Sequence, residues 1–355
     1  MNTSGLPDYF DSNTVKKDIS LESYLENSES DSTSSSECSE VSLEGYSSSI
    51  DSDSDESCII ANNTESLDDK LVIFKFYKTL SVKLLKTFSV GYSEALNSVQ
   101  HLMNTYRRVS CGNLPTEIDY TKKSNCIGYL QRYAACHAAL VLDAISDIFD
   151  SSSSHVLLSK LNKKSLNVMF LGGGPGNDFV GFLTALFSHH YHLFDLDVTV
   201  VDKMSGWEDV FSETVENLRG GDCGKASWFF EEVNIMTTFI AVDLKNIEEW
   251  NKNMKDKMQN ADIVFFIKAL SHIPDGDKLQ VLQNVVTSMK LESHLIYIDY
   301  PYPNEVFSSL SGYLRAVYHS YKTRYNLVHK DSAFGFSNID SCRAVAKLFQ
   351  RCENY

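Results

Sequence analysis

The sequence predicts an α/β protein with a doubly wound, mainly parallel sheet, an N-terminal helical extension and a disordered acidic head. Two observations support this fold class. Five short apolar runs alternate with helical stretches between residues 166 and 299, and a glycine-rich loop follows the first run. Because helices that connect parallel strands cover both faces of a sheet, the alternation favours a doubly wound core.

The first 69 residues form the acidic head. They contain 17 Asp and Glu against two Lys, which accounts for the whole net charge of −15. Such a Ser-rich, acidic segment buries too little apolar surface to offset its ordering entropy, so we expect residues 1–69 to be disordered. The remaining chain is neutral, which argues against a strongly basic nucleic-acid-binding domain but permits a local basic patch.

Several classes of protein are disfavoured by composition. No apolar run approaches the roughly 18 residues that a membrane helix needs, so we predict no membrane partner. The polar, acidic N-terminus does not resemble a secretory signal. Eight cysteines without a CxxC pair predict reduced thiols in an intracellular protein, cytoplasmic or nuclear. His189, His190 and His192 lack an acid or a cysteine to complete a ligand set, so no metal is predicted.

Residues 70–150 are predicted to form a helical segment that caps the core. Order is expected to begin near Leu71, because Ile73, Tyr77, Leu80 and Leu84 recur at helical spacing. A second apolar stripe runs from residue 130 to residue 148, and four serines at 151–154 end the segment.

The core is predicted over residues 151–355. Its strands are expected at Leu166–Leu171, Asp197–Val201, Thr238–Val242, Ala261–Ile267 and His294–Ile298. Its helices are expected at Phe179–Phe187, Glu208–Leu218, Ile247–Met258 and Asp277–Met289. The remaining pattern suggests a helix at Val306–Tyr325, a weak strand at Ala333–Phe336 and a helix at Cys342–Phe349. Ligands of such sheets bind at the carboxyl ends of the strands.

The glycine loop after the first strand reads G-G-G-P-G-N. It satisfies G-x-G-x-G with Gly172, Gly174 and Gly176, but Asn177 stands where a dinucleotide fold needs a further glycine. Pro175 stiffens the turn and removes one N–H donor, which suits a neutral or zwitterionic ligand better than a phosphate.

These features resemble the class I, Rossmann-like methyltransferases that use S-adenosyl-L-methionine, in a eukaryotic subgroup with the form GGGPG-x-D. The matching residues are the loop Leu171–Asp178, Asp202 after the second strand, Asp243 after the third, and Ala261–His272. The resemblance implies that the loop faces the methionine part of the cofactor, Asp202 the ribose and Asp243 the adenine. The implied cofactor-binding residues are Gly172, Gly173, Gly174, Pro175, Gly176, Asp178, Asp202 and Asp243.

The sequence departs from that family in two places. Phe170 stands where the family often has an acid, and Asp178 is expected to supply a carboxylate instead. Sheets of this family usually finish with a hairpin, but no good final strand is evident before residue 355. We therefore expect a core that lacks its last strands.

The catalytic residues are not identified by any motif, and four weak candidates stand out. Ser271 and His272 end the fourth strand, where a histidine could take a proton from an attacking nitrogen or oxygen. Asp299 and Tyr302 belong to a D-Y-P-Y stretch similar to the D-P-P-Y tetrad of amino-group methyltransferases. Tyr129, Arg132 and Tyr133 are candidates to close over the cofactor.

The predicted function is methyl transfer from S-adenosyl-L-methionine to RNA or, as a second choice, to protein. One alternative is a catalytically inactive, methyltransferase-like protein that binds partners. A second alternative is a nucleotide-dependent oxidoreductase, although the sequence lacks the sixth glycine-motif position and a catalytic Tyr/Lys or His pair. The sequence gives no indication of the oligomeric state.

Overall fold

The computed structural model describes residues 56–109, 118–190, 192–300, 305–326 and 338–353, with side chains from residue 69 onward. The predicted disordered head therefore lies almost entirely outside the described residues, as do Tyr302 and the predicted weak strand at 333–336. Everything below concerns the unit that begins at residue 55. In the described part of the chain, no helix is long and apolar enough to cross a membrane.

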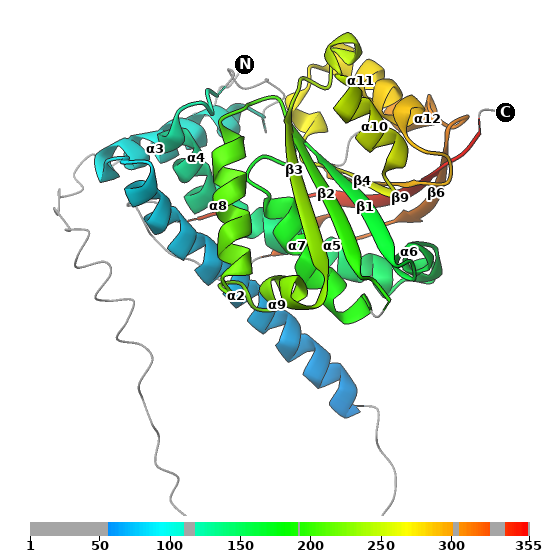
Figure 1. Ribbon diagram of the computed structural model, residues 1–355, viewed down its shortest axis with the longest axis horizontal. Helices are drawn as coiled ribbons and strands as arrows, with labels where there is room; N and C mark the ends of the chain where they lie inside the picture. Colours follow the sequence, from blue (N-terminus) through cyan, green and yellow to red (C-terminus); the bar gives the residue numbers. More distant parts are fainter. Residues whose placement is uncertain (1–55, 110–117, 191, 301–304, 327–337, 354–355) are drawn as a thin grey trace, which may run out of the picture. The chain divides into compact units, whose positions relative to one another are not determined.

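A seven-stranded sheet forms the centre of this unit (Figure 1). Its spatial order is β3-β2-β1-β4-β5-β9-β6. The first five of these strands run parallel, and β9 is antiparallel to both β5 and β6. A separate two-stranded ribbon joins β7 to β8. The bounds are β1 Ser165–Leu171, β2 Asp195–Asp202, β3 Asn234–Ala241, β4 Ile263–Ile267, β5 His294–Asp299, β6 Leu314–His319, β7 Arg324–Asn326, β8 Ser341–Arg343 and β9 Val345–Arg351.

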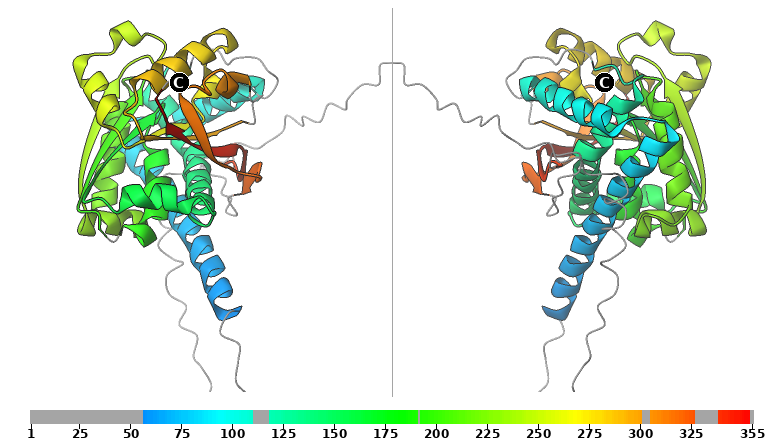
Figure 2. Two further views of the ribbon diagram at one scale, coloured as in Figure 1. Left: turned by 90° about the vertical axis from the view of Figure 1, so that its right-hand side faces the viewer. Right: turned by 90° about the vertical axis from the view of Figure 1, so that its left-hand side faces the viewer.

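Helices cover both faces of the sheet, which confirms the predicted fold class (Figures 1 and 2). Alternate residues of β1 explain the two layers, because successive side chains of a strand point to opposite faces. Met169 and Leu171 belong to the buried cluster that includes residues of α10 and α11. Phe170 faces the other side, where its ring stacks on Phe265 at 4.5 Å and meets Phe182 of α7.

The N-terminal helices are α2 Glu56–Thr87, α3 Tyr92–Val109, α4 Lys123–Tyr129, the π-helical turn η2 Leu130–Ala134, α5 Ala135–Phe149 and α6 Ser154–Leu161. Those between the strands are α7 Asn177–Leu186, η3 Phe187–His189, α8 Trp207–Arg219, α9 Gly224–Glu232, η4 Ile247–Glu249, α10 Lys252–Asn260, η5 Leu270–His272, α11 Asp275–Ser288 and α12 Glu305–Ser308. Helix α2 starts earlier than the expected Leu71. No Gly or Pro interrupts residues 56–87, and extending a formed helix is far less costly than nucleating it.

The C-terminal part differs from the sequence prediction. The helix expected at Val306–Tyr325 is wrong, since α12 is short and β6 and β7 follow it. The helix expected at Cys342–Phe349 is also wrong, since this stretch forms β8 and β9. Strand β9 is buried on both faces, so it lacks the alternation that identifies a half-exposed strand. The antiparallel strands β9 and β6 are thus present at the end of the sheet, contrary to the expectation that they are missing.

Candidate functional site

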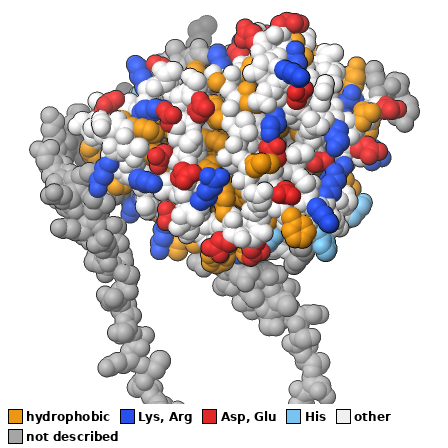
Figure 3. Space-filling model, viewed as in Figure 1, with side chains coloured by type: hydrophobic (Ala, Val, Ile, Leu, Met, Phe, Trp, Pro, Cys, Tyr) orange, Lys and Arg blue, Asp and Glu red, His pale blue; other side chains and the backbone are white. Residues whose placement is uncertain are grey.

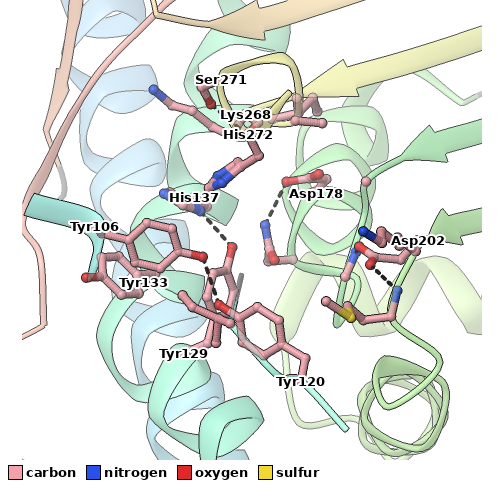
Figure 4. A pocket seen from close by; sticks show the side chains of 18 of the residues that line it. Tyr106, Tyr120, Tyr129, Tyr133, His137, Asp178, Asp202, Lys268, Ser271 and His272 are labelled. Atoms are coloured by element: carbon pink, nitrogen blue, oxygen red, sulfur yellow. Dashed lines mark hydrogen bonds between the residues drawn. The ribbon is translucent and has the colours of Figure 1, made fainter. Parts of the chain in front are cut away.

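A cavity of about 1040 Å³ lies at the carboxyl ends of the parallel strands (Figure 4). Its walls come from the loops after β1 to β5, from α3, from the η2–α5 region and from β8. A pocket for one drug-sized ligand occupies about 300–1,000 Å³. The cavity is therefore large enough to accommodate a cofactor together with part of a second molecule.

The glycine loop forms the floor of the cavity beside β1. The backbone N–H groups of Gly172 and Gly173 both donate to the carbonyl of Val201, at 2.7 and 3.2 Å, which ties the loop to the end of β2. Gly172 has φ +72°, and a Cβ there would lie 2.6 Å from the Cβ of Ala269. Only glycine fits such a backbone without strain or displacement. The loop thereby presents bare backbone to the cavity.

Not every predicted loop residue reaches the cavity. Gly172, Gly174 and Pro175 line it, whereas Gly173 packs against Phe170 and Gly176 against Phe211. Gly173 and Gly176 thus allow close packing around the loop.

Asp202 ends β2 and lines the cavity directly beside the glycine loop. Its Oδ2 accepts the N–H of Gly174 at 3.1 Å, and its Oδ1 accepts the N–H of Met204 at 2.9 Å. Burial raises the pKa of Asp202 to about 6, and these backbone donors oppose the rise. A carboxylate has about four lone-pair positions, so each oxygen can accept a further hydrogen bond from a ligand.

Asp178 lies in the first turn of α7, just after the loop, and also lines the cavity. The side-chain amide of Asn177 donates to its Oδ1 at 2.6 Å. Burial raises the pKa of Asp178 well above its ordinary value, and the nearby Asp202 raises it further. Two carboxylates in one buried place favour a positively charged ligand between them.

Asp243 follows β3 and lines the same cavity. Its Oδ1 accepts the N–H of Lys245 at 3.0 Å, and its Oδ2 lies 3.6 Å from the ammonium of Lys203. The structure therefore brings the predicted loop, Asp178, Asp202 and Asp243 together around one space.

An aromatic wall closes the cavity on the helical side, formed by Tyr106, Tyr120, Tyr129, Tyr133 and Trp207. The hydroxyls of Tyr106 and Tyr120 lie 2.8 Å apart (Figure 4). The ring centroids of Tyr120 and Trp207 lie 4.4 Å apart. Tyr133 and Arg132 lie in the π-helical turn η2, and such turns often occur at functional sites. A wall of this kind offers flat apolar surface and hydroxyl groups to a ligand.

The weak catalytic candidates are placed differently from one another. His272 lines the cavity, with its ring 5.5 Å from that of Tyr106, and burial lowers its pKa, which favours the neutral imidazole. Ser271 also lines the cavity, but its hydroxyl donates to the carbonyl of Lys268 at 3.0 Å. The fully buried Asp299 accepts the N–H groups of Ser271 at 3.0 Å and Tyr300 at 2.7 Å, which holds two loops together.

Sequence reasoning missed several residues of the site. His137 lies on α5, and its Nδ1 is 2.9 Å from the hydroxyl of Tyr129. Cys342 on β8 lines the cavity, and its sulfur lies 3.4 Å from that of the buried Cys136. Trp207, at the start of α8, packs on Tyr120 and Tyr129. No local motif marks these residues, because only tertiary packing brings them to the cavity.

The three histidines considered for a metal do not form a ligand cluster in the described residues. His190 instead lies 2.7 Å from Glu232, and His189 packs on Phe149. Among the described residues, no group of three or more His, Cys, Asp or Glu could hold a metal ion.

No protein-family model matches this sequence, and no curated protein matches it. Solved structures of low similarity include the N-methyltransferase NodS from Bradyrhizobium japonicum in complex with S-adenosyl-L-homocysteine, at 12% identity and TM-score 0.32, covering 61% of this chain and 100% of that one. Another is the magnesium protoporphyrin IX methyltransferase ChlM from Synechocystis PCC 6803 with bound SAM, at 12% identity and TM-score 0.35, covering 70% and 90%. A third is the 1,6-didemethyltoxoflavin-N1-methyltransferase from Burkholderia thailandensis, at 12% identity and TM-score 0.34, covering 60% and 79%. At such values these likenesses bear on neither substrate nor activity.

Proposed function

We propose that this chain binds S-adenosyl-L-methionine in the cavity and transfers its methyl group to an acceptor that enters from the aromatic side. The observation that carries this proposal is the convergence of the glycine loop and three carboxylates on one cavity of about 1040 Å³. RNA and protein side chains stay the predicted acceptor classes.

The residues present fit the cofactor. The bare backbone at Gly172 and Gly174 allows close approach of the methionine part, and Asp178 with Asp202 offers negative charge to its cationic groups. Asp202 has lone pairs for a ribose diol, and Asp243 stands where the adenine amino group is expected. Pro175, which lacks an N–H, makes the loop a poorer site for a pyrophosphate.

When bound, the cofactor supplies a methyl group already activated by its sulfonium. The chain then has to orient the acceptor in line with that methyl group and exclude water, which the closed aromatic wall favours. His272, kept neutral by its lowered pKa, is placed to accept a proton from the attacking atom. The Tyr129–His137 pair is a second proton acceptor within the same walls.

The test is calorimetric titration of the full chain with S-adenosyl-L-homocysteine, with NAD as the comparison ligand. We expect micromolar binding of the first alone. Asp202→Asn should weaken it by roughly 5- to 150-fold, which corresponds to about 1–3 kcal/mol for the lost charge-assisted hydrogen bonds.

The matched control is Asp197→Asn, on the same strand. Asp197 pairs with Lys257 at 2.6 Å and does not line the cavity, so its substitution should leave the affinity unchanged. Equal affinity of the Asp202 variant and the unmodified chain would contradict the assignment of the ribose site, and tight binding of NAD would favour the oxidoreductase alternative.

A further inference from the structure

The cavity carries opposite charges at its two ends. Asp178, Asp202 and Asp243 gather where the cofactor is proposed to bind. Four basic residues line the rest of the wall, from α3, η2, the end of β4 and β8: Arg107, Arg132, Lys268 and Arg343. In Figure 4, Lys268 and Tyr133 lie apart from Asp202.

The basic residues lie around two tyrosines. Burial raises the pKa of Tyr133 to about 12, and the neighbouring Arg132 and Arg107 oppose the rise. Burial likewise raises the pKa of Tyr300, against the influence of Arg343. The ammonium of Lys268 lies 3.9 Å from the ring centroid of Tyr300. All four cations line the same cavity, and the ammonium of Lys268 also donates to the backbone carbonyl of Arg343.

Three of these four charges lack a balancing carboxylate among the described residues. No described carboxylate lies within 4.0 Å of the charged groups of Arg132, Lys268 or Arg343. The lysines at the other end differ, since Lys203 pairs with Asp243 and Lys245 lies 3.7 Å from Asp277.

Two further details point to a missing anion. The Nε of Arg132 is buried and has no hydrogen-bond partner among the described residues, which is costly for a cationic donor. Lys268 donates to the carbonyl of Arg343, so the ammonium is held in place without being neutralised.

We propose that this end of the cavity binds an oxyanion, phosphate or carboxylate, carried by the methyl acceptor next to a flat ring. Arginine donates to either anion in a bidentate manner, and partial burial strengthens such bonds at Arg132. Tyr106, Tyr133 and Tyr300 provide the surfaces for the ring. The role of this site in selecting the acceptor rests on the proposed methyl transfer, whereas the binding of an anion does not.

The experiment measures the dissociation constants of three probes by ligand-observed NMR on the full chain, with and without saturating S-adenosyl-L-homocysteine. The probes are 1-naphthyl phosphate, 1-naphthoate and the neutral 1-naphthamide. We expect at least one anionic probe to bind at least tenfold more tightly than the amide. Preference for the phosphate assigns a phosphate-bearing acceptor, and preference for the carboxylate assigns a carboxylate-bearing one.

The variants separate this site from the cofactor site. Arg343→Gln and Arg132→Gln should each remove most of the tenfold preference. Arg343→Gln should also leave binding of S-adenosyl-L-homocysteine intact. Arg343 is exposed, so its variant should fold even if that of the half-buried Arg132 does not. Arg219→Gln, on α8 and paired with Glu216, is the control that should change neither affinity.

Two results would overturn the proposal: equal binding of the amide and both anions, or a preference that survives Arg343→Gln. Failure of the proposed function looks different. In that case S-adenosyl-L-homocysteine does not bind, while the anion preference persists in its absence and still depends on Arg343.

Discussion

The carboxylate of Asp202 is held by two backbone N–H groups, yet burial raises its pKa to about 6. In the unfolded chain this group titrates near 3.8. The folded state therefore binds its proton more tightly, and ionisation of Asp202 costs stability as the pH rises through about 6. That cost disappears below about pH 4, where both states are protonated. A carboxylate at a cavity wall whose ionised form is destabilised by burial is typical of a ligand-binding position.

The pH dependence of cofactor binding follows from this pKa. An ionised Asp202 accepts hydrogen bonds, and a protonated one is a weaker acceptor. The affinity for S-adenosyl-L-homocysteine should therefore increase as the pH rises through about 6. Asp178, whose pKa is raised as well, contributes in the same direction. Calorimetry between pH 5 and pH 8 should show the step in the unmodified chain and in Asp197→Asn. A step of the same size in Asp202→Asn would contradict the role of this carboxylate.

The residues of the site differ in how far the sequence could predict them. Acids that end a strand lie at the edge of a parallel sheet where the glycine loop also lies, so the sequence alone places Asp202 and Asp243 near the loop. Tyr106 and His137 come from helices outside the sheet, and no local spacing indicates which face of those helices meets the cavity. Tyr120 comes from the turn before α4, and no motif marks it. Arg343 is unpredictable for a further reason, because its segment was interpreted as helix.

At the scale of elements, α5 and α7 pack unusually closely. A Cβ on Gly181 of α7 would lie 2.2 Å from the carbonyl of Ala138 on α5. Backbone cannot yield as a side chain can, so any larger residue has to push the two helices apart. Helix α5 carries His137, and α7 begins at the glycine loop, so this contact also sets the width of the cavity.

Gly181→Ala should destabilise the protein by about 1–3 kcal/mol through overpacking. The control is Gly276→Ala in the first turn of α11, where an added Cβ meets nothing within 4 Å. It should stabilise the protein by about 0.4–1 kcal/mol, because alanine loses less backbone entropy. Urea denaturation measures both changes. A Gly181 variant as stable as the unmodified protein would show that the helices can separate freely.

The elements also show where sequence patterns fail. The first five strands are apolar runs between turn residues, and each appears in the structure close to its predicted place. Strand β9 was missed because Ala346, Lys347 and Leu348 are good helix formers and no alternation marks a strand buried on both faces. Its conformation is set by hydrogen bonds to β5 and β6, which are distant in sequence.

At the scale of the whole unit, β9 joins the edge strand β6 to the five parallel strands. Leu348 is fully buried and pairs with Ile296 of β5 and Tyr318 of β6. Figure 3 shows acidic and basic side chains interspersed on the face shown, so this face has no separate acidic and basic regions. Because this unit is compact and is built around one seven-stranded sheet, we expect its described part to unfold in a single cooperative transition.

Leu348→Ala tests that expectation. It should cost about 2–5 kcal/mol by leaving a cavity in the core, against less than about 0.5 kcal/mol for the exposed Leu291→Ala. The three tryptophans lie in α8, in α9 and after η4, outside β9 and the strands that pair with it. In Leu348→Ala, the tryptophan fluorescence and the far-UV circular dichroism should lose their native values at the same urea concentration. That concentration should be lower than the one for the unmodified protein. A tryptophan transition that does not move would show that the sheet unfolds in two parts.

The position of β9 also has a consequence for biosynthesis. On the ribosome, β6 emerges well before β9. In the sheet, however, β6 pairs with β9 and not with β5. During that interval the edge of β5 has no partner, and an unpaired strand edge can pair with another chain. The cavity residues of β8 emerge together with this late strand. A nascent chain should therefore acquire its ligand-binding capacity only after β8 and β9 have emerged, which makes the interval before β9 the period in which a chaperone would be most useful.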